Sequence, residues 1–345
     1  MSAEPRPRHI LLRAPNWLGD AVLAIPAMAA VRSHFADITR SIAASASVAA
    51  LFREVTPVNP NQVIDLPSAH QAATDVLKTA APDVVILFPN SFRSAWQAKR
   101  AGIAQRWGYG TAARRWLLTR VSPKARVEHQ SEYYRALVSG LGIRAEETLP
   151  RVGGTPGAFH AARALLTRAG VGEQPYIALL PGAAYGQAKQ WPAARMAEVA
   201  ARAIRTHGVA CVLLGAAHDR PAAREIESWL RVHAPDAASA CIDLVGQTNL
   251  GALTVILERA LLCVSNDSGG MHLAAATGTP VVALFGPTNE RATRPLGTHD
   301  VLLEPVFCRP CMLRDCPIDH RCMKRLTVDR VFGTVSAKLA QHGGV

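Results

Sequence analysis

Residues 261–288 constrain the fold of this chain more than any other segment. Residues 261–264 and 281–285 are short apolar runs of the kind found in buried strands, and the run of small residues at 269–277 between them predicts a helix. A strand, a helix and a second strand in succession form the basic unit of a parallel sheet. The chain is therefore predicted to be an α/β protein.

The loop of this unit, residues 266–270, has the composition of an anion-binding turn. Asp267 and Ser268 are suited to capping the helix, and Gly269 and Gly270 let a phosphate or another backbone come close. A helix N-terminus presents free N–H groups and the positive end of the helix dipole, which favours a phosphate. An ordinary crossover helix with a capped end is the alternative for a bare Asp-Ser-Gly sequence.

Two further features place ligand contacts near this turn. Met271 and His272 fall in the first helical turn, beside any anion bound there. Gly286, Pro287 and Thr288 end the second strand, so a second loop faces the same crevice at the carboxyl edge of the sheet.

Length and composition set the number of domains. A chain of 345 residues exceeds the size at which one core keeps growing, so two domains are expected. Hydrophobic residues make up 49% of the chain and charged residues 19%, which is enough apolar material for two cores and too much for disorder. Residues 1–8 are polar without a following signal-peptide core, and the longest apolar run, 21–31, is too short to span a bilayer. We therefore expect a cytoplasmic protein.

Strand-like and helix-like segments alternate in both halves of the chain, which predicts two Rossmann-like, doubly wound parallel sheets facing each other across a cleft. The Gly- and Pro-containing stretch at 142–157 is predicted to be the linker, giving domains at residues 1–155 and 156–345. A last helix, at 328–340, is expected to pack back across the domains. The strands are expected at 10–13, 41–44, 63–66, 84–88, 176–180, 209–214, 242–245, 261–264 and 281–285, and the other helices at 21–35, 71–80, 94–101, 193–206, 222–232, 250–259 and 269–277.

The first predicted strand leads through residues 14–20 into a long helix. Gly19 allows the loop to approach a ligand closely, and Asp20 falls in the first helical turn at the carboxyl edge of the sheet, where such sheets bind ligands. A carboxylate at this place could accept a proton. The alternative is an acidic residue that only interacts with the helix dipole.

From residue 93 to residue 126 the chain carries nine basic residues and no acidic one, with three tryptophans between them. Together with the net charge of +12, this stretch indicates an acidic partner. Nucleic acid is one interpretation, but no recognisable nucleic-acid module surrounds the stretch; a solvated helix face is another. We prefer a site for a phosphorylated, membrane-bound acceptor, with Arg114 and Arg115 as exposed charges.

Motifs of several common sites are missing or misplaced. Residues 108–113 match a dinucleotide fingerprint, but they follow Gln-Arg-Trp rather than an apolar strand, so we discount the match. The chain has no P-loop, no Gly-x-Ser-x-Gly elbow and no Asp-x-Asp pair for a metal-bound diphosphate. We therefore expect a diphosphate to be bound without a metal.

Three loops of the second half follow predicted strands and are expected to converge on one nucleotide-sized site. In the first loop Ala183 and Ala184 leave little side chain except Lys189, a point charge that can pair with a phosphate. Asp219 follows the next strand and is a candidate ligand of a ribose hydroxyl. Thr248 lies in the third loop, whose backbone could meet the edge of a base.

The seven cysteines fall into two groups. Three lie in apolar runs that predict strands, which is typical of buried thiols in a reducing compartment. The other four are Cys308, Cys311, Cys316 and Cys322, and together with His320 they could bind zinc, be oxidised in pairs, or form a loop of reduced thiols. Their spacing differs from the pair-plus-pair of a zinc ribbon, and we expect a metal-free loop that serves packing.

Five segments occur in an order that resembles one known family. They are Asn-Trp-Leu-Gly-Asp at 16–20, Gly-Ala-Ala-Tyr-Gly-Gln-Ala-Lys-Gln-Trp-Pro at 182–192, Asn-Asp-Ser-Gly-Gly-Met-His at 266–272, Gly-Pro-Thr at 286–288 and the cysteine cluster at 308–322. Together they resemble the ADP-heptose:lipopolysaccharide heptosyltransferase II family, which belongs to the ninth glycosyltransferase family and has the GT-B fold. The resemblance covers nearly the whole chain.

The resemblance implies an inverting transfer, without metal or cofactor, of L-glycero-D-manno-heptose from ADP-heptose to the first heptose of the lipopolysaccharide inner core. The N-terminal domain would bind the phosphorylated, lipid-linked acceptor at the inner face of the cytoplasmic membrane, and the C-terminal domain would bind ADP-heptose. By motif position Asp20 would be the catalytic base and Lys189 the diphosphate lysine. The residues implied to contact the substrates are Asn16, Gly19, Ala183, Ala184, Asp219, Thr248, Asp267, Ser268, Gly269, Gly270, Met271, His272 and Gly286.

The related heptosyltransferase I has two hydroxyl residues where this chain has Ala183 and Ala184, so we expect no hydroxyl contacts to phosphate from these positions. Two other classes of function remain as alternatives. A GT-B nucleotide-sugar epimerase would use the same second-domain site but would leave the basic, tryptophan-rich stretch without a role. A nucleic-acid-binding protein would explain the charge but not the loops of the second half.

Overall fold

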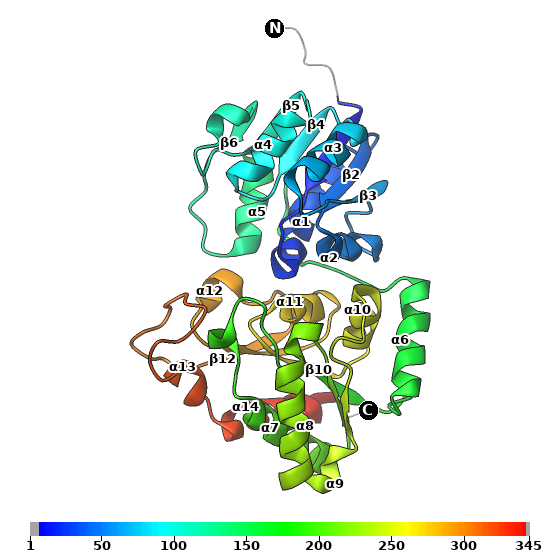
Figure 1. The fold of residues 1–345 in the computed structure, drawn as a ribbon, viewed down its shortest axis with the longest axis vertical. Helices are drawn as coiled ribbons and strands as arrows, with labels where there is room; N and C mark the ends of the chain where they lie inside the picture. Colours follow the sequence, from blue (N-terminus) through cyan, green and yellow to red (C-terminus); the bar gives the residue numbers. More distant parts are fainter. Residues whose placement is uncertain (1–6, 343–345) are drawn as a thin grey trace. The chain divides into compact units, whose positions relative to one another are not determined.

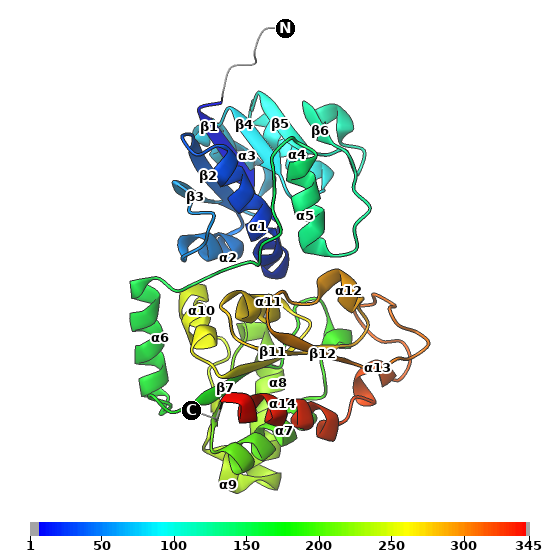
Figure 2. The ribbon, with the colours of Figure 1, turned by 180° about the vertical axis from the view of Figure 1, so that it is seen from behind.

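A computed structural model of the chain describes residues 7–342, which form two compact units. The first unit is Met1–Val152 and the second is Gly153–Val345. Each is built on its own six-stranded parallel sheet with helices on both faces (Figures 1 and 2). The predicted α/β class with two doubly wound sheets is confirmed.

The first sheet has the strand order β3-β2-β1-β4-β5-β6, and every neighbouring pair is parallel. The direction of winding changes between β1 and β4, and sheets of this kind bind ligands beside the loops that follow two such strands. The strands are β1 His9–Arg13, β2 Thr39–Ala44, β3 Gln62–Asp65, β4 Val84–Leu87, β5 Gln105–Tyr109 and β6 Arg120–Ser122.

Helices cover the two faces of the first sheet because its central strands are apolar on both sides. On one face Leu11 and Leu87 pack with side chains of α3 and α4, whereas α1 and α5 pack together on the other face (Figures 1 and 2). The helices of this unit are α1 Leu18–His34, α2 Ala46–Ala49, α3 His70–Ala80, α4 Phe92–Arg100 and α5 Gln130–Ser139, with short 3-10 helices η1 Ala50–Arg53 and η2 Arg115–Leu117.

The second sheet repeats this arrangement in the order β12-β11-β10-β7-β8-β9, again with parallel neighbours. Its winding changes between β7 and β10, so the loops after these strands are where a sheet of this kind binds a ligand. The strands are β7 Tyr176–Leu180, β8 Ala210–Leu213, β9 Cys241–Asp243, β10 Leu262–Asn266, β11 Val281–Phe285 and β12 His299–Leu303.

The core of the second unit forms where α7, α8 and α14 cover one face of its sheet, and α10 packs with α6 and α11. Trp191 and Met323 are among the buried side chains of this core. The helices are α6 Pro156–Arg168, α7 Ala193–His207, α8 Arg220–His233, α9 Pro235–Ala238, α10 Leu250–Glu258, α11 Gly269–Ala276, α12 Glu290–Thr293, α13 Arg321–Lys324 and α14 Val328–His342, with 3-10 helices η3 Gln187–Lys189 and η4 Ala217–Asp219.

Several elements were not predicted from the sequence. Strand β5 lacks an apolar run, yet Trp107 and Tyr109 in it are buried. The expectation that residues 108–113 do not follow a buried strand was therefore wrong. The match is nevertheless no dinucleotide site, because β5 continues into a turn and the three-residue helix η2. Helix α6 begins inside the predicted linker, with Thr155 capping the Ala158 N–H at 3.4 Å. Elements β6, β12 and α5 were also missed.

Candidate active site

Asn266, at the end of β10, fixes the loop that follows β7. Its Oδ1 accepts a hydrogen bond from the Trp191 N–H at 3.0 Å, and its Nδ2 donates to the Pro181 carbonyl at 2.7 Å. The side chain is fully buried, so these bonds replace those it would make with water. Asn266 therefore ties both ends of the loop between Pro181 and Trp191 to β10.

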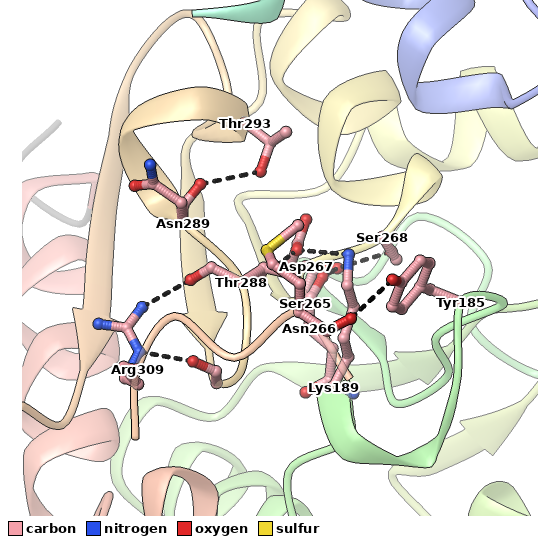
Figure 3. A network of polar contacts seen from close by, with 12 residues as sticks. Tyr185, Lys189, Ser265, Asn266, Asp267, Ser268, Thr288, Asn289, Thr293 and Arg309 are labelled. Carbon is pink, nitrogen blue, oxygen red and sulfur yellow. Dashed lines mark hydrogen bonds and ion pairs between the residues drawn. The ribbon is translucent and has the colours of Figure 1, made fainter. Parts of the chain in front are cut away.

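Asp267 joins three loops at the start of α11 (Figure 3). Its Oδ2 lies 2.6 Å from Lys189 Nζ and accepts a hydrogen bond from Thr288 Oγ1 at 2.7 Å. Both side chains are largely shielded from solvent, with exposed fractions of 13% for Lys189 and 4% for Asp267. The structure thus brings together the lysine of the β7 loop, the acid of the β10 loop and the threonine that follows β11.

The start of α11 differs from the sequence prediction in its cap. Ser268 has an extended backbone, with φ −145° and ψ 168°, and its side chain accepts no capping hydrogen bond. Its Oγ lies 3.3 Å from Ser265 Oγ instead, so the expected capping role of this side chain is wrong. Because the helix still presents its N-terminal N–H groups and the positive end of its dipole, an anion is favoured here.

The glycines of α11 serve close packing as well. Gly269 is the first residue of the helix, and a Cβ on Gly270 would lie 2.1 Å from Leu180 Cδ2, so a larger residue at this position would displace the Leu180 side chain. Met271 is fully buried, which leaves only its backbone for a ligand. His272, in the first turn, is 6% exposed.

Asp219, the last residue of η4 after β8, lies beside the β7 loop. Its Oδ2 accepts a hydrogen bond from the Ala216 N–H at 2.9 Å, and a Cβ on Gly182 would fall 1.9 Å from its Oδ1. The carboxylate is buried against the backbones of Gly182 and Gly215, so neither glycine can be replaced without displacing it. This places a carboxylate next to the loop that carries Lys189.

The other predicted contacts in this unit are less uniform. Ala183 is buried and Ala184 is exposed, in agreement with a loop that contributes little side chain. Thr248 is partly buried just before the Asn249 cap of α10. Gly286 is a packing position, since a Cβ there would lie 3.0 Å from Met323.

The cysteine-containing loop is anchored to the same site by a residue that the sequence did not reveal. Arg309 donates from Nε to the Gly286 carbonyl and from Nη2 to the Thr288 carbonyl at 2.9 Å (Figure 3). It also pairs with Glu290 at 3.0 Å. An arginine inside a cysteine cluster gives no sequence signal of such a structural role. Arg309 therefore fixes the position of the loop after β11.

The four cysteines of this loop lie near one another. Burial raises the pKa of the Cys322 thiol, and the neighbouring Cys308, Cys316 and Cys311 raise it further. Within residues 7–342, no three His, Cys, Asp or Glu side chains are arranged to hold a metal ion.

In the first unit, Asp20 lies in the opening turn of α1, and its carboxylate is hydrogen-bonded to Tyr134 of α5. Burial, followed by the negative charge of Asp20, raises the pKa of Tyr134 well above its usual value. The phenol therefore stays protonated and donates to the carboxylate. Sequence reasoning missed Tyr134 because it is more than one hundred residues away in the chain.

The loop before α1 is held by Arg13. This side chain donates to the Ala14 carbonyl at 2.8 Å and to Asn16 Oδ1 at 3.0 Å. Burial lowers the pKa of Arg13 to about 10, so the guanidinium remains charged at neutral pH. Asn16 is exposed and Gly19 is buried, so of these two predicted contacts only Asn16 presents an accessible side chain.

Arg114 is not an exposed charge, which corrects the prediction for the basic stretch. It is 0% exposed and donates to the carbonyls of Pro89 and Tyr109 and to Ser94 Oγ. Burial lowers the pKa of Arg114 to about 10. Its bonds hold the segment after β5 to the loop after β4, so its role is structural, whereas Arg115 is exposed as expected.

Three aromatic side chains of this stretch form a surface cluster, which we call the aromatic patch: Phe92, Trp96 and Trp116. Their ring centroids are 6.1 to 6.2 Å apart. Phe92 is 42% and Trp116 60% exposed, and Lys99 Nζ lies 4.7 Å from the Trp116 ring centre. Lys99 thus adds a positive charge to the apolar surface of the patch. No helix within residues 7–342 is long and apolar enough to cross a membrane.

Sequence comparison relates most of the chain to one family. Residues 71–321 match Glycosyltransferase family 9 (heptosyltransferase). The chain is 31% identical over 306 residues to lipopolysaccharide heptosyltransferase 2 of Escherichia coli K12, a match that covers 83% of this chain and 85% of that protein.

Structural comparison gives the same result. The solved structure of E. coli ADP-heptose LPS heptosyltransferase II matches with a TM-score of 0.82 and 26% identity, over 97% of this chain and 99% of that chain. A family 9 glycosyl transferase from Veillonella parvula matches with a TM-score of 0.84 over 97% of this chain and 98% of that chain; its identity of 19% supports the fold alone.

Proposed function

The chain belongs to glycosyltransferase family 9, the heptosyltransferases, and from this premise we propose that it transfers a heptose from ADP-heptose to the inner core of lipopolysaccharide. The specific reaction proposed is inverting transfer of L-glycero-D-manno-heptose to the first heptose of that core. The observation that supports it best is the Lys189–Asp267 pair at the N-terminus of α11, because it places a cation beside a helix end that favours a diphosphate.

The second unit would bind ADP-heptose. Lys189 and the N–H groups of Ser268, Gly269 and Gly270 would take up the charge of the diphosphate. Asp219 would accept hydrogen bonds from the ribose hydroxyls, since its carboxylate lies against Gly182 of the loop after β7. The remaining contacts proposed in this unit are Ala183, Ala184, Thr248, Asp267, Met271 through its backbone, His272 and Gly286.

The first unit would supply the base and bind the acceptor. Asp20 would remove the proton of the acceptor hydroxyl as its oxygen bonds to the anomeric carbon, while the bond to the diphosphate breaks and ADP leaves with the electron pair. Asn16 and Gly19 would line the acceptor site. The Tyr134 hydrogen bond supports this role of Asp20 because it fixes the orientation of the carboxylate.

The acceptor would be phosphorylated and linked to lipid, and the protein would work as a peripheral protein at the inner face of the cytoplasmic membrane. The aromatic patch with the exposed Arg93, Lys99, Arg100 and Arg115 supports this proposal. Aromatic rings favour the interfacial region of a bilayer, and basic side chains favour its anionic headgroups.

The transfer assay that tests the proposal uses ADP-heptose with and without a heptose-bearing core acceptor. We expect ADP release and acceptor glycosylation only when both substrates are present. Isomerisation of the nucleotide sugar without acceptor would instead indicate an epimerase, the alternative that the family relationship does not favour. Absence of any turnover or ADP binding, together with tight binding of nucleic acid, would favour the other alternative.

A further inference from the structure

We propose that Arg314, on the cysteine-containing loop, is a second cation of the diphosphate site. The inference rests on the proposed use of ADP-heptose and extends it to a loop that the proposed mechanism leaves without a chemical role.

The backbone of Arg314 lies against the β7 loop. The Ala188 N–H donates to the Arg314 carbonyl at 2.9 Å. A Cβ on Gly186 would lie 2.4 Å from that carbonyl oxygen, so the two segments can approach this closely only because residue 186 is glycine. Arg314 therefore has a defined place beside Lys189, one residue beyond Ala188.

The backbone of Met312, two residues before Arg314, is hydrogen-bonded to two loops. Its N–H donates to the Pro287 carbonyl at 2.9 Å, and its carbonyl accepts from the Tyr185 hydroxyl at 2.9 Å. Residues 312–314 thus connect the loop after β7 with the loop after β11, the same two loops that Asp267 joins through Lys189 and Thr288.

The charged groups of Lys189 and Arg314 lie near the same aromatic ring. Lys189 Nζ lies 4.8 Å and the Arg314 guanidinium carbon 5.2 Å from the ring centre of Tyr185. The two cations are therefore at most about 10 Å apart, and both contact the same ring.

The positive charges of Lys189 and Arg314 differ in how far a carboxylate balances them. Lys189 is paired with Asp267, so part of its positive charge is already balanced by the carboxylate before a diphosphate approaches. Arg314 is exposed, and within residues 7–342 its guanidinium makes no ion pair with a carboxylate. A departing diphosphate needs positive charge that is not already neutralised, and a guanidinium fits two phosphate oxygens at once. Arg314 meets this need.

The test compares ADP and AMP binding by calorimetry in the full-length protein and in Arg314→Gln. We expect Arg314→Gln to weaken ADP about 10-fold, the effect of losing one charge-assisted hydrogen bond, and to leave AMP nearly unchanged. Arg314→Lys should recover part of the loss because it keeps the charge without the planar fork. Arg325→Gln, which removes another exposed arginine of the same region, is the matched control and should bind ADP like the unsubstituted protein.

Each contrary result has a separate meaning. Unchanged ADP affinity in Arg314→Gln, an equal loss for AMP, or an equal loss in Arg325→Gln would overturn the inference while the proposed function stands. Failure of the unsubstituted protein to bind ADP would overturn both. If Arg314→Gln also lowers the melting temperature, Arg314→Lys decides: restored stability without any recovery of ADP affinity would count against a phosphate contact.

Discussion

The ammonium of Lys189 lies 2.6 Å from a carboxylate oxygen of Asp267, so the lysine expected to hold a diphosphate already has a buried anionic partner. A charge pair removed from water is costly to break on one side, because the remaining charge stays buried without its partner. The pair therefore positions Lys189, and a phosphate that approaches it meets an oriented ammonium.

Replacing Lys189 with alanine should weaken ADP binding about 10-fold or more and lower the free energy of unfolding by about 3 kcal/mol, because Asp267 is left unpaired. Calorimetry with ADP and denaturant unfolding measure the two effects. The double variant Lys189→Ala with Asp267→Asn separates them: we expect most of the stability to return while ADP affinity stays low. Unchanged ADP affinity in Lys189→Ala would rule out a diphosphate role.

Replacing His272 with alanine should weaken ADP or ADP-heptose binding about 10-fold, because this side chain lies in the first turn of α11. The alternative is a role in the core, which the low exposure of the His272 side chain also fits. A normal nucleotide affinity combined with a lower melting temperature would establish the core role. His272→Gln, which keeps a polar side chain, serves as the second variant.

The nine strands that are apolar runs and the second-unit loops were predictable because their signals are local. Apolar runs gave the bounds of β7 and β11, and Lys189 stood out as a candidate phosphate ligand because its loop otherwise consists largely of small residues. Contacts between distant segments gave no such signal. The pairing of Lys189 with Asp267, and of Asp20 with Tyr134, depends on how the sheets bring loops together, and no pattern within one loop encodes it.

The basic stretch shows why charge alone misleads. Arg114 and Arg115 are adjacent and chemically identical, yet one is buried and the other exposed. The difference arises because the carbonyls of Pro89 and Tyr109 need donors where the loops after β4 and β5 meet. That need is visible only in the folded chain.

Replacing Arg114 with methionine should lower the free energy of unfolding by about 3 kcal/mol, since it leaves buried carbonyls without donors. Arg115→Met is the matched control, and being exposed it should change stability by less than about 0.5 kcal/mol. Denaturant unfolding of the two variants provides the measurement. Equal stability of both variants would contradict the structural role of Arg114.

Replacing Arg100 and Arg115 together with glutamine should raise the KM for the lipid-linked acceptor several-fold and flatten its dependence on salt, because exposed charges act through screened attraction. The KM for ADP-heptose should not change. Flotation with vesicles containing anionic lipid measures the membrane contribution, and Trp116→Ser should reduce it separately. If acceptor and donor KM rise equally, or vesicle binding is unaffected, this face is only a solvated surface.

The Asp20→Asn variant tests the proposed base directly. Asparagine keeps the shape of the side chain and a partner for the Tyr134 hydroxyl, so folding should survive. ADP binding should also survive, because the proposed nucleotide contacts all lie in the second unit. Transfer should fall by about 10²–10⁴-fold, the usual contribution of a positioned base.

Tyr134→Phe is the companion variant, because it removes only the hydrogen bond to the Asp20 carboxylate. If Tyr134 positions the base, kcat should fall about 10-fold with little change in the KM for ADP-heptose. The pH at which the rate rises should also shift, since the carboxylate loses a donor that favours its charged form. That rise should move to higher pH, because a carboxylate without its hydrogen bond holds its proton more strongly. An unshifted pH profile in Tyr134→Phe would leave Tyr134 a packing residue, and near-normal turnover in Asp20→Asn would mean that another group takes the proton.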